Sequence, residues 1–444
     1  MKNRVRIAPS PTGFMHLGTA RATLFNYLFI KNIGGEFILR IDDTDKERCQ
    51  PEYEASIIKG LKWLGLNYDD IYYQSKNKDK YSQAIVTLLE NNSAYWSQEE
   101  NPKPGQSPEV IRFRNPGGEI VFEDLIHGSI KFKIDDLGDF IIAKNLEQPL
   151  YHLASIVDDI DSEITHIIRG DDHIANTPRQ ILLWQALTDK STPQWAHIPM
   201  ILAPDKSKLS KRHGAVSLLA YKEEGYLPEA MINFLALLGW TPQAKTPNNK
   251  PTDKEIFGLE ELIKRFHLSG ISKNGAIFNI DKLNWINQIY LKKQSTKEMI
   301  QEIPKYWPET EKLSLQTREK FWNLVVERIH TLHQLAHPDI QAEWNFILNR
   351  PKPDPELIKN PLHLKPLADR LSEIPANNFT AENIKEKIWN YATEEGRGEV
   401  LWPMRTALTG LKKSTDPFSA AELLGSTETL HRLKIAEESF KNNE

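Results

Sequence analysis

Near the start of the chain, apolar and polar positions follow two patterns, one typical of buried strands and one with the periodicity of a helix. Val5–Ile7 begins a short apolar run, and Phe37–Ile41 is a second, continuous β-type run. Between them, apolar residues recur at helical spacing over Leu17–Ile30, until the pair Gly34-Gly35 interrupts the pattern. A strand, a helix and a further strand predict a right-handed βαβ unit with its ligand site at the carboxyl ends of the strands.

The pattern changes from about residue 72 to residue 149. A helical stretch over Lys80–Asn92 leads into the Pro- and Gly-rich segment Asn101–Pro108, and alternating runs at Val110–Arg114 and Ile120–Ile134 predict antiparallel strands. We interpret this region as an insertion that splits the nucleotide-binding sheet. The α/β pattern then resumes at Tyr151–Val157, Ile164–Arg169 and the helical stretch Thr177–Leu187.

Beyond residue 200 the chain reads as mostly helical. Helices are predicted over Pro228–Leu238, Leu259–Phe266 and Ile280–Tyr290, whereas the proline-containing loop Thr241–Asp253 is expected to be exposed. From about residue 317 no segment has the pattern of a strand. The predicted fold is therefore α/β: a Rossmann-like domain (1–72 and 149–200), an α+β insertion (73–148), a helical domain carrying a lysine loop (201–316) and an all-α region (317–444).

Composition is compatible with several folded domains. The chain has 444 residues, of which 40% are hydrophobic and 26% charged, as expected for a soluble globular protein. It contains no apolar run of the about 20 residues that a membrane span requires. With a single cysteine, Cys49, an internal disulfide and a thiolate-rich zinc site are excluded, and we expect a cytoplasmic location. The net charge of −4 does not indicate a nucleic-acid binder, although local basic faces decide that question.

Two short segments carry the candidate chemistry. The first, Pro9–Thr19, reads PSPTGFMHLGT. Gly18 lacks the Cβ that would obstruct a purine and ribose, and His16 at a helix start can donate to phosphate oxygens, helped by the helix dipole. Pro9 and Pro11 stiffen the turn. The alternative is an ordinary strand–turn–helix junction.

The second segment, Lys208-Leu209-Ser210-Lys211-Arg212, offers two lysines on a small loop. Attack of a carboxylate on an α-phosphate builds negative charge, which mobile ammonium groups stabilise. Taken alone, such a segment is more often a solvated basic loop. Because the two segments occur in this order around a split sheet, we predict that they converge on one triphosphate.

This pair of motifs resembles the ATP-binding motifs of class I aminoacyl-tRNA synthetases. Thr19, where the generic motif has a second histidine, and the preceding run Arg6–Gly13 resemble the bacterial-type glutamyl-tRNA synthetases. The resemblance covers nearly the whole chain and continues through Arg40–Asp45, Tyr151–Ser155, Asp158-Asp159, Ile168–His173, Gly225–Ala230, Leu238–Trp240 and Leu401–Gly410.

The resemblance implies an ATP-dependent glutamate–tRNA ligase, with Mg²⁺ accompanying ATP and with tRNA(Glu) and L-glutamate as the other substrates. The implied catalytic residues are His16, Lys208 and Lys211. The implied ATP-binding residues are Pro9, Ser10, Thr12, Gly13, His16, Gly18, Thr19, Asp172, His173, Leu209, Ser210 and Lys211. The implied glutamate-binding residues are Arg6, Ala8, Ser10, Asp42, Tyr151, Ser155 and Arg169. The family also implies a monomer whose Rossmann-like domain (1–72 and 149–200) is catalytic. It further implies an acceptor-stem-binding insertion (73–148), a stem-contact domain (201–316) and an anticodon-binding region (317–444).

The chemistry of the glutamate set is consistent with its substrate. Arg6 and Arg169 can grip carboxylates through paired N–H donors, while Asp42 can receive the ammonium group. The alternatives are a surface salt bridge for Arg6 and a cap or loop hydrogen bond for Asp42.

This sequence departs from the family pattern at three of these positions. Asp42 and Asp172 stand where the family commonly or often has Glu, and Ser155 stands where some members have Asn. The stretch Tyr95–Glu100 contains no cysteine where some members have a zinc knuckle, so no zinc is expected.

Candidate tRNA-binding residues are Arg48, Arg318, Arg328 and Arg405, for each of which a helix-surface arginine without a ligand is an equal alternative. Two other readings remain open: a non-discriminating ligase that also charges the tRNA for glutamine with glutamate, and a non-catalytic RNA-binding paralogue. A dinucleotide-dependent oxidoreductase is disfavoured because the first strand is not followed by a G-x-G-x-x-G turn.

Overall fold

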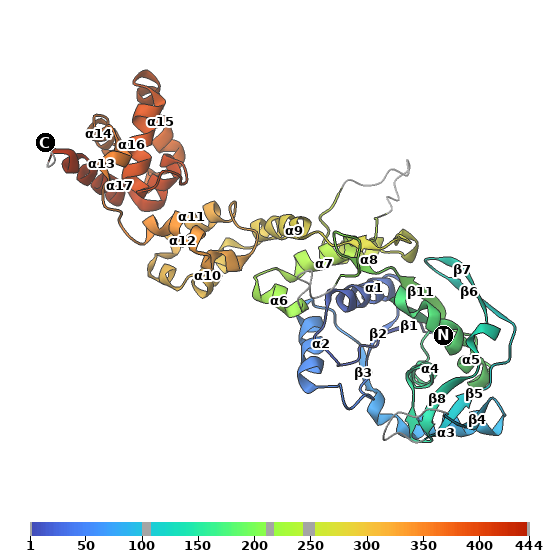
Figure 1. Cartoon of the computed structure of the whole chain (residues 1–444). Helices are drawn as coiled ribbons and strands as arrows, with labels where there is room; N and C mark the ends of the chain where they lie inside the picture. Colours follow the sequence, from blue (N-terminus) through green and yellow to red (C-terminus); the bar gives the residue numbers. More distant parts are fainter. Residues whose placement is uncertain (1, 100–107, 210–216, 243–253, 442–444) are drawn as a thin grey trace, which may run out of the picture. The chain divides into compact units, whose positions relative to one another are not determined.

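A seven-stranded sheet organises the first part of the chain (Figure 1). The computed structural model describes residues 2–99, 108–209, 217–242 and 254–441. The chain divides into two compact units, Met1–Ile286 and Asn287–Glu444.

The order of strands in the main sheet is β3-β2-β1-β10-β11-β6-β7. Neighbouring strands are parallel, except that β6 and β7 form an antiparallel hairpin. The strands are β1 (Arg4–Ile7), β2 (Glu36–Ile41), β3 (Asp70–Tyr73), β6 (Glu119–Asp124), β7 (Gly128–Lys133), β10 (His166–Gly170) and β11 (Gln194–Ile198).

The predicted βαβ unit is confirmed. Helix α1 (Leu17–Ile33) connects β1 to β2 and ends at Gly34, whose φ of 76° is a conformation that glycine adopts without strain. Helix α2 (Pro51–Trp63) connects β2 to β3. Because β2 is largely buried, its sequence reads as a continuous apolar run over residues 37–39.

The region between β3 and α4 forms a second, smaller sheet. Helix α3 (Lys78–Glu90) precedes four strands in the antiparallel order β4-β5-β8-β9, with bounds Ala94–Gln98, Glu109–Phe113, Phe140–Asn145 and Gln148–Pro149. The antiparallel strands predicted here are confirmed. The β6–β7 hairpin, however, leaves this sheet and extends the main sheet beside β11, through the pair Asp124 and Trp195.

The remaining elements of the first unit are helical or short. Helices α4 (Tyr151–Asp161) and α5 (Thr177–Leu187) flank β10 in sequence, and a two-stranded sheet joins β12 (Ile201–Leu202) to β13 (Ala276–Ile277). The other helices are α6 (Leu218–Glu223), α7 (Pro228–Leu237), α8 (Leu259–Arg265) and α9 (Ile280–Lys293), the last of which continues into the second unit. The helices expected from the sequence at α7, α8 and α9 are confirmed. Most of the loop expected over 241–253 lies outside the described residues.

The second unit is helical throughout its described residues, as predicted (Figure 1, orange to red). Its α-helices are α10 (Thr296–Tyr306), α11 (Leu315–Val325), α12 (Pro338–Trp344), α13 (Pro355–Ile358), α14 (Leu364–Ser372), α15 (Ala381–Glu394), α16 (Arg397–Thr409) and α17 (Pro417–Lys441). Along the described part of the chain, no helix is both long and apolar enough to span a bilayer.

Buried Arg432 ties three elements of the second unit together. Its guanidinium donates to the carbonyl of Leu408 at the end of α16 (2.5 Å) and to the carbonyl of Phe346 (2.9 Å), and it pairs with Glu428 one turn earlier on α17 (2.7 Å). Since these carbonyl oxygens have little access to water, the side chain supplies hydrogen bonds that a solvent molecule cannot replace.

Arg432→Met should therefore loosen the packing of α16 and α17. Two buried carbonyls and Glu428 would lose a charged donor, which costs about 2–4 kcal/mol. Hydrogen exchange measured by mass spectrometry on the full chain should accelerate in peptides from these helices. Lys434→Met, a change at an exposed position of the same helix, should leave the exchange unchanged. Equal exchange in both variants would contradict the role of Arg432.

Candidate active site

The first motif lies at the carboxyl end of β1, where the chain turns into α1. His16 is the N-cap of α1, and its Nδ1 accepts a hydrogen bond from the backbone N–H of Thr19 (3.2 Å). A Cβ on Gly18 would lie only 3.0 Å from two atoms of the His16 ring. Gly18 thus allows the imidazole to fold back over the helix start, a reason for glycine that the sequence reasoning did not contain.

Backbone hydrogen bonds hold the chain on both sides of the second motif, and one of them joins it to the first motif. Leu209 N–H donates to Ile201 at β12 (3.1 Å), and Leu218 N–H donates to the carbonyl of Met15 (2.7 Å). The segment 210–216 between them, including the candidate residues Ser210 and Lys211, lies outside the described residues. The chain on both sides of that segment is nevertheless fixed, and its far end is bonded to the residue before His16.

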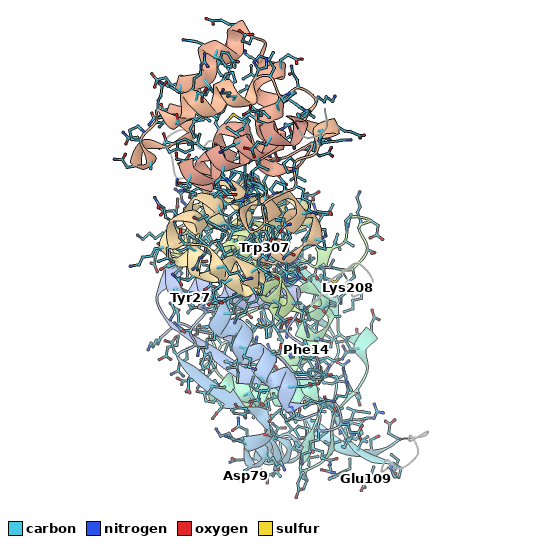
Figure 2. The ribbon with its side chains drawn as sticks, turned by 90° about the vertical axis from the view of Figure 1, so that its left-hand side faces the viewer. Phe14, Tyr27, Asp79, Glu109, Lys208 and Trp307 are labelled. Carbon is cyan, nitrogen blue, oxygen red and sulfur yellow. The ribbon has the colours of Figure 1, made fainter. Side chains whose placement is uncertain are left out.

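Three side chains from separate segments form a charged cluster at this point. Lys208 Nζ lies 3.9 Å from a carboxylate oxygen of Asp172, and both side chains are exposed. Burial lowers the pKa of His16, the charge of Lys208 lowers it further, and Asp172 acts in the opposite direction. The imidazole therefore lies within electrostatic reach of both residues. Figure 2 labels Lys208 and also Phe14, the neighbour of Met15.

Asp172 itself depends on a glycine. A Cβ on Gly170, the last residue of β10, would lie 2.5 Å from Oδ1 of Asp172. His173, next in the chain, lies 3.3 Å from the hydroxyl of Tyr151 and 3.2 Å from the amide nitrogen of Asn176. Burial, with a contribution from Arg169, lowers the pKa of His173 to about 4. His173 is thus a neutral ring at neutral pH.

Beneath the cluster, two arginines and two aspartates form a buried network. Arg6 binds Asp159 through two N–H groups (2.9 and 3.2 Å). Arg40 also binds Asp159 (2.7 Å) and grips Asp42 through two N–H groups (2.7 and 3.2 Å). All four residues are at most 5% exposed, so Arg6 is not in a surface salt bridge. A third aspartate, Asp158, adjoins them and accepts hydrogen bonds from Gln74, Asn77 and Tyr81.

Burial and pairing set opposing pKa shifts in this network. Burial raises the pKa of Asp159, but Arg6 and Arg40 outweigh it, so the net pKa is below its usual range. Burial also raises the pKa of Asp42, and Arg40 offsets this only in part. The hydroxyl of Ser155 accepts from Arg40 as well (3.0 Å). Sequence reasoning assigned no role to Arg40 or Asp159. The spacing Arg40-Ile41-Asp42 was a usable signal, because residues i and i+2 share one face of a strand.

Arg169 on β10 lies near this network but has different partners. Its Nε donates to Nε2 of His197 (3.2 Å) and its Nη2 to the hydroxyl of Thr177 (2.8 Å). Burial lowers its pKa to about 10, and the neighbouring Tyr151 hydroxyl partly offsets this. Its Nη1 is buried and has no hydrogen-bond partner among the described residues.

The four candidate tRNA-binding arginines have different surroundings. Arg48 is exposed near Asp45 (3.9 Å). Arg318 donates to the carbonyls of Leu313 and Ile300, and Arg405 donates to that of Lys412. Arg328 is exposed. These contacts give Arg318 and Arg405 a structural role within the second unit.

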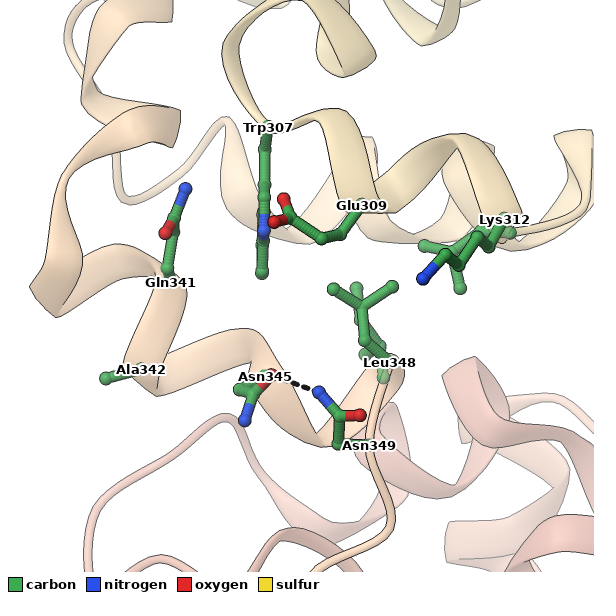
Figure 3. Close-up of a pocket in the computed structure, with 10 residues that line it drawn as sticks. Trp307, Glu309, Lys312, Gln341, Ala342, Asn345, Leu348 and Asn349 are labelled. Atoms are coloured by element: carbon green, nitrogen blue, oxygen red, sulfur yellow. Dashed lines mark hydrogen bonds between the residues drawn. The ribbon is translucent and has the colours of Figure 1, made fainter.

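The second unit also contains a surface hollow of about 510 Å³ (Figure 3). It is lined by Trp307, Glu309, Lys312, Leu313, Gln341, Ala342, Asn345, Ile347, Leu348 and Asn349, with a hydrogen bond between Asn349 and Asn345 (2.8 Å). The residues around it include neither motif nor any candidate site residue.

Comparison with known proteins agrees with this geometry. The model of "tRNA synthetases class I (E and Q), catalytic domain" matches residues 2–104 and 96–285, and that of "Anticodon binding domain" matches residues 285–437. The chain is 36% identical to "Glutamate--tRNA ligase 2" of Koribacter versatilis, covering 98% of each chain.

Two solved structures are similar over nearly the whole chain. A glutamate tRNA ligase from Elizabethkingia meningosepticum, solved in complex with its amino acid, gives a TM-score of 0.86 at 31% identity, covering 99% of this chain and 100% of that one. The glutamate–tRNA synthetase of Elizabethkingia anophelis gives 0.85 at 32% identity, with the same coverage.

The chain therefore belongs to the class I tRNA synthetases of the E and Q group, with a catalytic domain followed by an anticodon-binding domain. Within that class its whole-length similarity is to glutamate–tRNA ligases, which confirms the resemblance seen in the sequence.

Lys208→Met should raise the pKa of His16 toward its ordinary value, because a cation that disfavours the imidazolium is removed. Asp172→Asn should lower the same pKa further, because an anion that favours the imidazolium is lost. Titration of the His16 ring by NMR measures both. Lys206→Met, at an exposed position of the same loop, is the control. If neither Lys208→Met nor Asp172→Asn changed the pKa of His16, the two motifs would not share a site.

Proposed function

We propose that this chain is a glutamate–tRNA ligase that activates glutamate with ATP and transfers it to the 3′-terminal adenosine of tRNA(Glu). The observation that carries the proposal is the approach of the lysine segment to the first motif, with Leu218 bonded to Met15 and Lys208 acting on His16. A lysine and an imidazole that can donate a hydrogen bond, at the start of a helix, suit the phosphates of ATP. The buried arginines alongside suit an amino acid with two carboxylates.

In the first step, an oxygen of the glutamate α-carboxylate attacks the α-phosphorus of ATP. The new C–O–P linkage forms as the bond to the β-phosphate oxygen breaks, and pyrophosphate leaves with the electron pair. The terminal hydroxyl of tRNA then attacks the activated carbonyl carbon and AMP leaves. No side chain needs to bond covalently to the substrate, so the enzyme acts by alignment and charge neutralisation.

His16, Lys208 and Lys211 are the proposed residues that neutralise the phosphate charge. The proposed ATP site further comprises the turn from Pro9 to Gly13, Gly18 and Thr19, with Asp172 and His173 at its edge. The proposed amino-acid site comprises Arg6, Ala8, Ser10, Asp42, Tyr151, Ser155 and Arg169. In the structure Asp42 is held by Arg40, so it would share its charge between that arginine and the substrate ammonium.

Mg²⁺ would neutralise part of the triphosphate charge when it is bound with ATP. The described residues include no group of three or more His, Cys, Asp or Glu side chains able to hold a metal ion. The zinc-free state, the monomer, the cytoplasmic location and the four-part division of the chain remain part of this proposal.

Aminoacylation assays with purified tRNAs test the assignment directly. Labelled glutamate should be attached to the tRNA for glutamate, and labelled glutamine should be attached to neither tRNA. Attachment of glutamate to the tRNA for glutamine as well would identify a non-discriminating enzyme. No attachment of any amino acid would contradict the proposal and favour an RNA-binding paralogue.

Lys211→Ala should lower glutamyl-adenylate formation by about a hundredfold or more, because an ammonium that meets the charge developing on the α-phosphate is lost. Pyrophosphate exchange in the presence of tRNA measures this rate, and glutamate affinity should stay nearly unchanged. Lys206→Met serves as the control for removal of a nearby exposed lysine. Equal loss of the rate and of glutamate affinity would indicate misfolding rather than lost catalysis.

A further inference from the structure

Two of the three buried arginines around the amino-acid site are neutralised by carboxylates, and the third is not. Arg6 and Arg40 each bind aspartates at 2.7–2.9 Å. Arg169, 7% exposed, binds neutral groups: an imidazole nitrogen, the hydroxyl of Thr177 and, at 3.4 Å, the carbonyl of His173, and the Tyr151 hydroxyl also interacts with it. Its guanidinium also lies over the indole of Trp195, 5.1 Å from the ring centroid.

The imidazole that holds Arg169 is itself held by a buried carboxylate. His197 Nδ1 lies 2.7 Å from Oδ2 of Asp124, and both side chains are fully buried. The other oxygen of Asp124 accepts the backbone N–H groups of Ile126 and His127 (2.9 Å each), and Oδ2 also accepts the N–H of His197 (3.1 Å). With four donors bound, the carboxylate cannot rotate.

These contacts fix which ring nitrogen of His197 carries the proton. An ionised Asp124 accepts only, so Nδ1 donates to it and Nε2 keeps its lone pair as an acceptor, within hydrogen-bond distance of both Arg169 Nε (3.2 Å) and the Thr177 hydroxyl (3.1 Å). Burial lowers the pKa of His197, so the ring is neutral. The lone pair faces the Nε–H of Arg169, which it can accept without cancelling the arginine's charge.

We propose that Asp124 and His197 are positioning residues that hold Arg169 with its charge intact and its Nη1 free for a carboxylate of the amino-acid substrate. Hydrogen bonds at Nε and Nη2, together with the Trp195 ring on one face, leave Nη1 as the donor not yet used. A carboxylate directly on Arg169 would cancel the charge that the substrate needs. Because Asp124 contacts the neutral ring of His197 and not Arg169 itself, it helps to orient the guanidinium without neutralising its charge. The inference rests on the proposed function.

The hairpin that extends the main sheet supplies this acid. Asp124 is the last residue of β6, which pairs with β11 through Trp195, two residues before His197. A residue of the region between the two halves of the sheet thus reaches an arginine of the proposed amino-acid site through one intervening side chain.

Two substitutions at His197 separate positioning from packing. A glutamine amide can place an acceptor oxygen where Nε2 was, whereas an asparagine amide reaches only the position of Nδ1. His197→Gln should keep the KM for glutamate within about threefold, and His197→Asn should raise it about tenfold or more, with the KM for ATP unchanged in both. A purely structural role, in which only the bond to Asp124 matters, predicts the reverse order.

The substitution Asp124→Asn tests the proposal independently of the His197 variants. The amide would present an N–H to His197, move the ring proton to Nε2 and turn a donor toward Arg169, so the KM for glutamate should again rise about tenfold. Glu123→Gln, at the exposed neighbouring position of β6, is the matched control and should behave as the unmodified chain.

Ring ¹⁵N chemical shifts of His197 in the unmodified protein complete the test. They should show a neutral ring protonated at Nδ1. The opposite tautomer, an imidazolium, or equal effects of the glutamine and asparagine variants would overturn the proposal. These outcomes differ from failure of the proposed function, in which the unmodified chain would not attach glutamate to any tRNA.

Discussion

The burial of charge at the carboxyl ends of β1, β2 and β10 constrains the rest of the first unit. Arg6, Arg40 and Asp159 come from two strands and one helix, and each lacks water to solvate it. Breaking one pair in such a network leaves an uncompensated buried charge, which costs about 3–5 kcal/mol. The elements that carry these residues must therefore keep a fixed register. The residues proposed to bind the substrate lie on the same elements and are held rigidly with them.

Local features of this arrangement could be predicted from the sequence. The apolar rhythm gave α1 and its flanking strands, because helix and strand periods are properties of adjacent residues. The turn after β1 and the lysine segment could be identified from their local sequence motifs, and the family that these motifs indicate is confirmed. The antiparallel strands at Glu109–Phe113 and Glu119–Lys133 also followed from alternation.

Contacts between distant segments could not be predicted in this way. Nothing near Asp124 in the sequence shows that it faces His197, 73 residues away, because that contact exists only when β6 joins β11. Gly18 was assigned to ligand clearance, yet the nearest atoms belong to the His16 ring. The partner of Asp42, Arg40, lies only two positions away, but the charge of Asp42 alone does not show whether it pairs with a substrate or with a residue of the protein.

The distribution of charge gives the three arginines separate tasks. Asp159 and Asp42 balance Arg6 and Arg40, so these two arginines hold the strands and α4 in place, and Arg6 would meet the proposed substrate with its charge already partly balanced. Arg169 has no carboxylate partner within hydrogen-bond distance among the described residues. Its burial lowers its pKa to about 10. An anion that binds there gains an interaction that no internal group already satisfies. A carboxylate can supply that charge and an amide cannot, so in the proposed site one buried arginine without a carboxylate partner would favour glutamate over glutamine.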